Sequence, residues 1–184
     1  MTAAAARTRL GALACPAFAR LLSGQLVTAI GTQMSNTAAA WVLYRQTHSA
    51  AALGLQGLCF SLPIAVLPLL TGVLADRFSR TALVKATLAA EAAQAFALAA
   101  LASAGTLRPW MLYLAAVADA GRLAVSIPAA SALVPNVVPS PVLLSALALS
   151  SSTWSSSAMI GPALAGALLA AGPAVVFALN GTCT

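Results

Sequence analysis

Long apolar runs are the feature of this sequence that most restricts its fold. A helix that spans a bilayer needs about 20 mainly apolar residues. Five such windows follow one another, at residues 18–44, 50–75, 81–104, 110–134 and 143–171. A sixth apolar run, the stub 173–184, is too short to span. The sequence therefore predicts an all-α integral membrane fold with five full transmembrane helices and a truncated sixth.

The composition leaves too little polar surface for a water-soluble domain. Of the 184 residues, 61% are hydrophobic and 7% are charged, and the mean hydropathy is +0.95. Soluble domains carry roughly 25% charged residues. The formal net charge of +6 comes mostly from residues in the gaps between apolar runs, without interleaved aromatic residues. This pattern favours a protein embedded in the lipid bilayer and argues against a nucleic-acid partner.

The basic residues also predict an orientation, because positively charged loops stay on the cytoplasmic side. One set of segments holds six of them: Arg7, Arg9, Arg20, Arg77, Arg80 and Lys85. The opposite set holds only Arg45 and Arg108. Residues 1–17 are therefore expected to form a cytoplasmic N-terminal arm, and residues 18–184 a transmembrane bundle.

Residues suited to catalysis or metal binding are scarce. His48 is the single histidine, and the three cysteines, Cys15, Cys59 and Cys183, are far apart in the sequence. The sequence contains no phosphate-binding loop of the G-x-x-x-x-G-K-[ST] type. We therefore expect no metal site, no disulfide framework, no cofactor and no enzymatic activity.

Three ionisable residues lie within the spans, where charge is costly and often functional. Glu91 lies midway along the third window and shares one helix face with Thr87 and Gln94. Asp119 and Arg122, in the fourth window, are three residues apart and can pair directly. One interpretation of this pair is a charge-neutral structural lock. The other is a proton or substrate site, in which protonation of Glu91 or Asp119 couples a proton gradient to transport.

The stretch GVLADRFSR, residues 72–80, places charge directly after the second window. The positive-inside rule accounts for Arg77 and Arg80 but not for Asp76, which follows the unfavourable C-terminal end of a helix dipole. Gly72, one turn earlier, allows a partner helix to approach closely. The stretch resembles the loop signature of the major facilitator superfamily, roughly G-x-L-A-D-R-x-G-R-R between helices two and three. The matching residues are Gly72, Leu74, Ala75, Asp76, Arg77 and Arg80, whereas Ser79 and Thr81 depart from the signature.

A second stretch, SAMIGPALAG at 157–166, resembles the G-x-x-x-G-P-x-x-G-G signature of antiporter-type members of that superfamily. Gly161, Pro162 and Gly166 match it, and Ser157 and Ala165 stand where Gly is expected. Small residues at this spacing also allow plain tight packing of helices. The preceding run, SSSTWSSS at 150–157, is compatible with a cavity lining, with bonds back to its own helix or with close helix contacts.

Other stretches are similar to the enterobactin-exporter and macrolide-efflux-like branch of the superfamily. They include LLSGQLVTAIGTQM in helix one, which contains Gly24 and Gln25, and IPAASALVPNVVP after helix four. Ala130 and Ala158 depart from polar or basic positions of that branch.

The resemblance implies the N-terminal half of a transporter with two six-helix halves and a substrate site between them. It implies antiport of protons against small amphipathic molecules, of drug or siderophore type, across a bacterial inner membrane. It also implies that Asp76 meets a helix N-terminus of the C-terminal bundle, which is missing here, and helps to close the cytoplasmic side. The chain alone is then a truncated half that does not transport. The alternatives are a non-transporting membrane fragment or scaffold, and a small membrane enzyme for which catalytic residues are lacking.

Overall fold

The computed structural model describes residues 16–75, 80–137 and 143–184, and its regular structure there is entirely helical. The α-helices are α2 (Pro16–Thr47), α3 (Ala50–Ala75), α4 (Arg80–Ser103), α5 (Pro109–Val137), α6 (Leu143–Leu168) and α7 (Pro173–Cys183). A short 3₁₀ turn, η2 (Leu169–Ala171), joins α6 to α7. The all-α class expected from the apolar runs is thus confirmed for the described residues.

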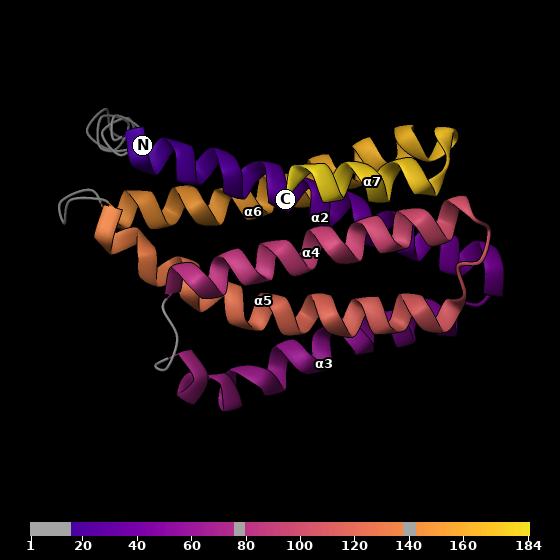
Figure 1. Ribbon diagram of the computed structural model, residues 1–184, viewed down its shortest axis with the longest axis horizontal. Coiled ribbons are helices and arrows are strands. Elements are labelled where there is room, and N and C mark those ends of the chain that lie inside the picture. Colours follow the sequence, from indigo (N-terminus) through magenta and orange to yellow (C-terminus); the bar gives the residue numbers. More distant parts are fainter. Residues whose placement is uncertain (1–15, 76–79, 138–142) are drawn as a thin grey trace.

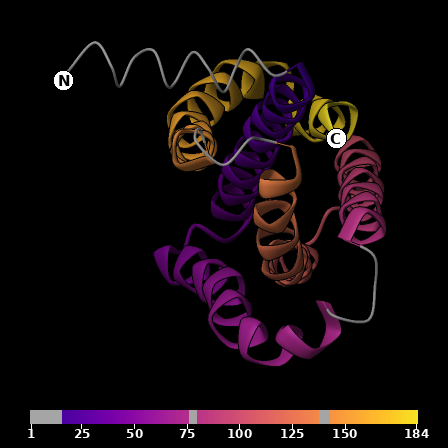
Figure 2. The same cartoon turned by 90° about the vertical axis from the view of Figure 1, so that its left-hand side faces the viewer.

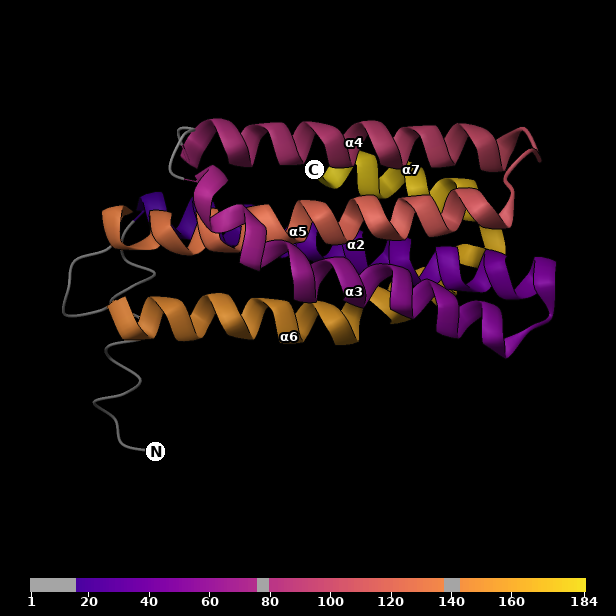
Figure 3. The same ribbon diagram turned by 90° about the horizontal axis from the view of Figure 1, so that it is seen from below.

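The helices run roughly along one direction (Figure 1), and α2 lies near the centre of the bundle when it is viewed from one end (Figure 2). It contacts α3, α5, α6 and α7. Viewed from one end, α6 flanks α2 on one side, while α5 and α7 flank it on the other (Figure 2). Helix α4 packs on both α5 and α7, and α3 packs mainly on α5 at the edge of the bundle (Figure 3). Residues of α2, α4 and α5 can therefore meet inside the bundle.

Local sequence signals end the helices where the chain turns. Gly105 has φ +67°, a left-handed conformation that glycine adopts without a Cβ penalty. Beside it, the Thr106 N–H donates to the Leu101 carbonyl at 3.0 Å, which satisfies the end of α4. Gly172, with φ +111°, precedes Pro173 at the start of α7. The Gln46 side chain donates to the Leu107 carbonyl at 2.9 Å, which places the end of α2 beside the α4–α5 connection.

The interior of the bundle is built largely from small and medium apolar side chains. Ala38, Leu43, Leu112 and Phe177 are fully buried, on α2, α5 and α7. The exterior is also apolar: the exposed fraction is 84% for Leu144 and 79% for Met159. By contrast, Glu91 is only 4% exposed and Asp119 8%. A helical bundle in lipid is expected to have this arrangement, with large apolar residues outside and charged residues inside.

Three helical segments in the described part of the chain are long and apolar enough to cross a membrane. They are Ala50–Leu67, Ala82–Ser103 and Leu144–Ala171. The five full spans predicted from the sequence are therefore not all shown. The other two predicted windows lie in α2 and α5, which are helical but are not among these segments.

Candidate functional site

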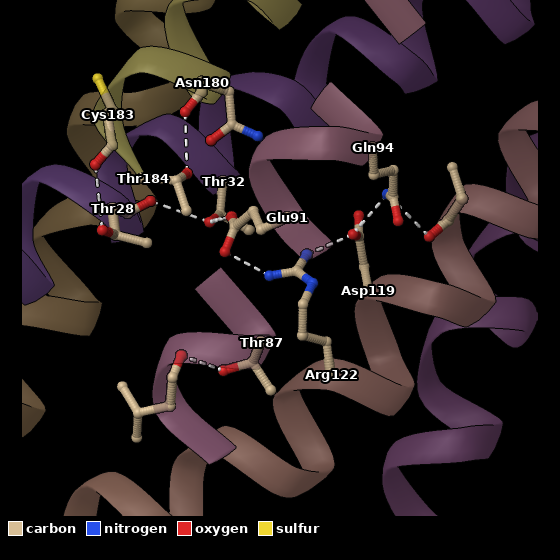
Figure 4. A network of polar contacts seen from close by, with 12 residues as sticks. Thr28, Thr32, Thr87, Glu91, Gln94, Asp119, Arg122, Asn180, Cys183 and Thr184 are labelled. Atoms are coloured by element: carbon tan, nitrogen blue, oxygen red, sulfur yellow. Dashed lines mark hydrogen bonds and ion pairs between the residues drawn. The ribbon is translucent and has the colours of Figure 1, made fainter. Parts of the chain in front are cut away.

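The candidate site is a buried cluster of charged side chains between α4 and α5, with α2 alongside (Figure 4). Arg122 of α5 forms ion pairs with both nearby carboxylates. Its Nη1 contacts Glu91 Oε2 across to α4, and its Nη2 contacts Asp119 Oδ1 on its own helix. The three side chains are between 5% and 11% exposed. The sequence predicted the Asp119–Arg122 pair but not that Glu91 joins it.

Two neutral side chains complete the cluster. The Thr32 hydroxyl of α2 lies 2.5 Å from Glu91 Oε1, and 2.9 Å from the carbonyl oxygen of Thr28 one turn earlier. The Gln94 amide of α4 donates to Asp119 Oδ1 at 2.7 Å and lies 3.3 Å from the Ala115 carbonyl. Each Glu91 oxygen therefore accepts from one side chain, Thr32 or Arg122, whereas Asp119 Oδ1 accepts from two, Arg122 and Gln94.

The charges of the cluster do not cancel. Two carboxylates surround one guanidinium, so with all three groups ionised the cluster has one excess negative charge. Burying a charge is unfavourable unless it is paired and hydrogen-bonded, and the excess charge here is shared over several donors. A bundle held by packing alone has no need of such a group, which makes the cluster a candidate for ion or proton handling.

A polar contact between α2 and α7 lies next to the charged cluster (Figure 4). The Thr28 hydroxyl donates to the Cys183 carbonyl at 3.2 Å. Asn180 packs over Gly31, where an added Cβ would lie 2.6 Å from the amide oxygen. That oxygen is buried and has no hydrogen-bond partner among the described residues. Gly31 thus permits the close approach of α7 beside Thr32.

The sequence reasoning missed Thr32 and Asn180. Thr28 and Thr32 are four residues apart in an otherwise apolar window and so share a helix face, a signal that could have marked this side of α2 as polar. Asn180 was part of the short terminal run and had no pattern to distinguish it. Thr87 lies one turn before Glu91 in α4, and its hydroxyl donates to the Val84 carbonyl at 2.9 Å.

The loop motif predicted at 72–80 lies partly outside the residues that the structure describes. Gly72 and Leu74 belong to the last turns of α3, and Arg80 is the first residue of α4. Asp76 and Arg77 fall outside the described residues. The interpretation of Asp76 as part of a closing contact stays a prediction.

The residues of the second motif point in two directions. Ser157, Gly161 and Ala165 are buried on the face of α6 that packs on α2, whereas Pro162 and Gly166 are exposed. A Cβ added at Gly161 would lie 2.5 Å from Gln33 Cβ and 3.2 Å from the Ile30 carbonyl oxygen. Gly161 is therefore the more closely packed of the two glycines of this motif, since a Cβ at Gly166 would meet nothing within 4 Å.

The serine-rich run before this motif bonds to its own helix. Ser151, Ser152, Thr153, Ser155 and Ser157 each donate to the carbonyl four residues earlier. Trp154 is 42% exposed on the outside of the bundle. Two of the interpretations that the sequence left open are seen here: most of the run bonds back to its own helix, and Ser157 is also buried at the contact with α2.

The helix-one residues Gly24 and Gln25 are not part of the charged cluster. Gly24 is exposed, and a Cβ added there would meet nothing within 4 Å. Gln25 is half-buried. Among the described residues, no three His, Cys, Asp or Glu side chains come together in a way that could hold a metal ion.

The apolar exterior, the candidate spans and the buried charges together define a multi-pass helical membrane protein. A family model for transmembrane secretion effectors, related to the major facilitator superfamily, matches residues 7–184, and the chain belongs to that family. Membership places it among membrane proteins of transport and secretion, a group that is typically not enzymatic. No curated protein and no solved structure matches the chain.

Proposed function

We propose that this chain is the N-terminal bundle of a proton-coupled exporter of small amphipathic molecules, with its N-terminus in the cytoplasm of a bacterial inner membrane. The observation that carries the proposal is the Glu91–Arg122–Asp119 cluster, which keeps one excess negative charge inside an otherwise apolar bundle. Proton uptake by either carboxyl group removes that charge. The loss of this charge changes the electrostatic contacts between α4 and α5. A proton gradient can act on the bundle through these contacts.

The substrate path is proposed to lie between this bundle and a second one. In transporters of this architecture the substrate binds between two halves near the midplane, and the halves rock around it. On this proposal the 184 residues do not transport alone. A reading frame that continues with six further spans would supply the second half and a partner for Asp76.

Dye transport in energised vesicles tests this proposal. The protein used is the proposed transporter in which a second bundle follows this chain, called the parent below. Ethidium, an amphipathic cation, is added outside everted membrane vesicles that contain the parent, and the lumen is made acidic. Gradient-dependent ethidium movement is expected with the parent and is expected to be lost with Glu91→Gln or Asp119→Asn. Ser152→Ala is the matched control, because its hydroxyl is exposed and bonds only to its own helix.

Two outcomes would contradict the proposal. Efflux by the purified 184-residue chain above empty vesicles would show that no second bundle is needed. A parent in which Asp76→Asn and both carboxyl variants behave as wild type would favour the alternative of a non-transporting membrane scaffold or fragment.

A further inference from the structure

The two carboxylates of the cluster differ in the kind of donor that they face. A guanidinium only donates hydrogen bonds, whereas a hydroxyl can either donate or accept. Arg122 donates to both carboxylates. The remaining donor is an amide for Asp119 and a hydroxyl for Glu91. This difference decides which carboxyl group, once protonated, faces a side chain that can accept its hydrogen bond.

Asp119 faces donors that are fixed in direction. Its Oδ1 accepts from Arg122 Nη2 and from Gln94 Nε2. Turning the Gln94 amide over would place its oxygen against the Ala115 carbonyl, which now lies 3.3 Å from Nε2. Both donors therefore hold Asp119 Oδ1 as an acceptor, and neither can accept a hydrogen bond from a protonated Asp119.

Glu91 faces one donor that can reverse. The Thr32 hydroxyl has a single proton and two acceptors within reach, Glu91 Oε1 at 2.5 Å and the Thr28 carbonyl at 2.9 Å. When Glu91 is ionised, the hydroxyl donates to it. When Glu91 carries a proton on Oε1, the hydroxyl proton turns to the Thr28 carbonyl, and Thr32 Oγ1 accepts from Glu91.

We propose that Glu91, and not Asp119, is the carboxyl group that takes up and releases the coupled proton, and that Thr32 is the positioning residue that keeps it hydrogen-bonded in both states. This inference rests on the proposed function. A hydronium ion from the aqueous side supplies the proton and leaves water. One O–H bond forms on Glu91 Oε1, and the cluster changes from one excess negative charge to none.

The surroundings of Glu91 agree with this assignment. The charged groups that face it are Arg122 and Asp119 of α5. From α2 it meets the Thr32 hydroxyl. Helix α7, which also packs on α4, contains no charged residue in Pro173–Cys183. The reversal of Thr32 thus transmits the charge state of α4 to the central helix α2, next to its close contact with Asn180 at Gly31.

Isotope labelling of glutamate marks the vibrational band of the Glu91 carboxyl group alone, because Glu91 is the single glutamate of the chain. The chain is made with carboxyl-¹³C glutamate, placed in lipid vesicles and studied by infrared difference spectroscopy as the pH is lowered. The protonated-carboxyl band that appears is expected to shift with labelled glutamate. With labelled aspartate, in an Asp76→Asn background that leaves Asp119 alone, the band is expected to stay in place.

Two variants of Thr32 test the positioning role. Thr32→Val keeps the shape and removes the hydroxyl, so the protonated Glu91 band is expected to move to higher wavenumber. Thr32→Ser keeps the hydroxyl, and its band is expected to coincide with that of the wild type. A band that shifts with labelled aspartate, no titrating glutamate band, or an unmoved band in Thr32→Val would each overturn the assignment.

The spectroscopic result is separate from transport. A labelled Glu91 band that responds to Thr32, together with no ethidium movement in the parent, would sink the proposed export function and leave the proton site standing. Efflux that is lost in Asp119→Asn but kept in Glu91→Gln would support the export function and overturn the assignment of the proton site to Glu91. If Thr32→Val does not fold, the label assignment in the wild type still decides between Glu91 and Asp119.

Discussion

Two helix contacts inside this bundle are made in opposite ways. Helix α6 lies on α2 through small side chains, with Gly161 directly against the backbone of Ile30 and Gln33. Helix α4 is tied to α5 by the ion pair of Glu91 with Arg122 and by Gln94 with Asp119. The first contact depends on shape and the second on charge. A contact made by charges responds to protonation, whereas a contact made by shape does not. On the proposed function, we therefore expect protonation to change the α4–α5 contact and to leave the α2–α6 contact as it is.

The largest effect on stability is expected from Arg122→Met. The variant leaves Glu91 and Asp119 buried without their cation, which costs about 3–5 kcal/mol. The free energy of unfolding in lipid bicelles measures the loss. The control is Arg45→Met, whose guanidinium lies 5.0 Å from the Trp41 ring at the exposed end of α2, with an expected loss below about 1 kcal/mol. Equal losses in both variants would refute the structural role of the charge contact.

Gly161→Ala is expected to have the next largest effect. The new Cβ would meet Gln33 Cβ at 2.5 Å and the backbone of α2, and overpacking of this kind costs about 1–3 kcal/mol. Gly166→Ala is the matched control, since a Cβ there meets nothing and alanine gains about 0.5–1 kcal/mol within a helix. The same unfolding measurement should therefore give opposite signs. A loss in both would show that the tight contact is not at Gly161.

Neutralising one carboxylate is expected to change stability less. In Glu91→Gln or Asp119→Asn the guanidinium of Arg122 keeps one charged partner and the buried cluster becomes neutral. We expect a change of about 1 kcal/mol, the scale of one hydrogen bond. Combining Glu91→Gln with Arg122→Met in a double-mutant cycle should reveal strong coupling, because the two residues are in direct contact. Additive losses would contradict the contact.

The smallest effect is expected from Ser157→Ala. The Ser157 side chain is fully buried against α2, but its hydroxyl bonds to the Thr153 carbonyl of its own helix at 2.8 Å. Alanine keeps the small size and is the better helix former, so the stability should stay within about 0.5 kcal/mol of the wild type. A larger loss would mean that the α2–α6 contact depends on polarity and not only on shape.

The helical class of the protein could be predicted from its sequence, because it follows from local properties. The length and hydropathy of a segment show that it is helical and lipid-embedded before any tertiary contact is known. The same local reasoning predicted five full spans, and three segments among the described residues meet both criteria. It also found the Asp119–Arg122 pair, because residues three apart on one helix are neighbours in any fold.

The sequence by itself determined that this is an all-α, apolar chain with a few charges inside its helices. Only the tertiary structure decided which of those charges meet. Glu91 and Arg122 are 31 residues apart, and Thr32 and Glu91 are 59 apart, so these contacts depend on how α2, α4 and α5 pack together. Helical periodicity places a residue on a face of its own helix, but the partner of that face is set by packing between helices, which no local pattern encodes.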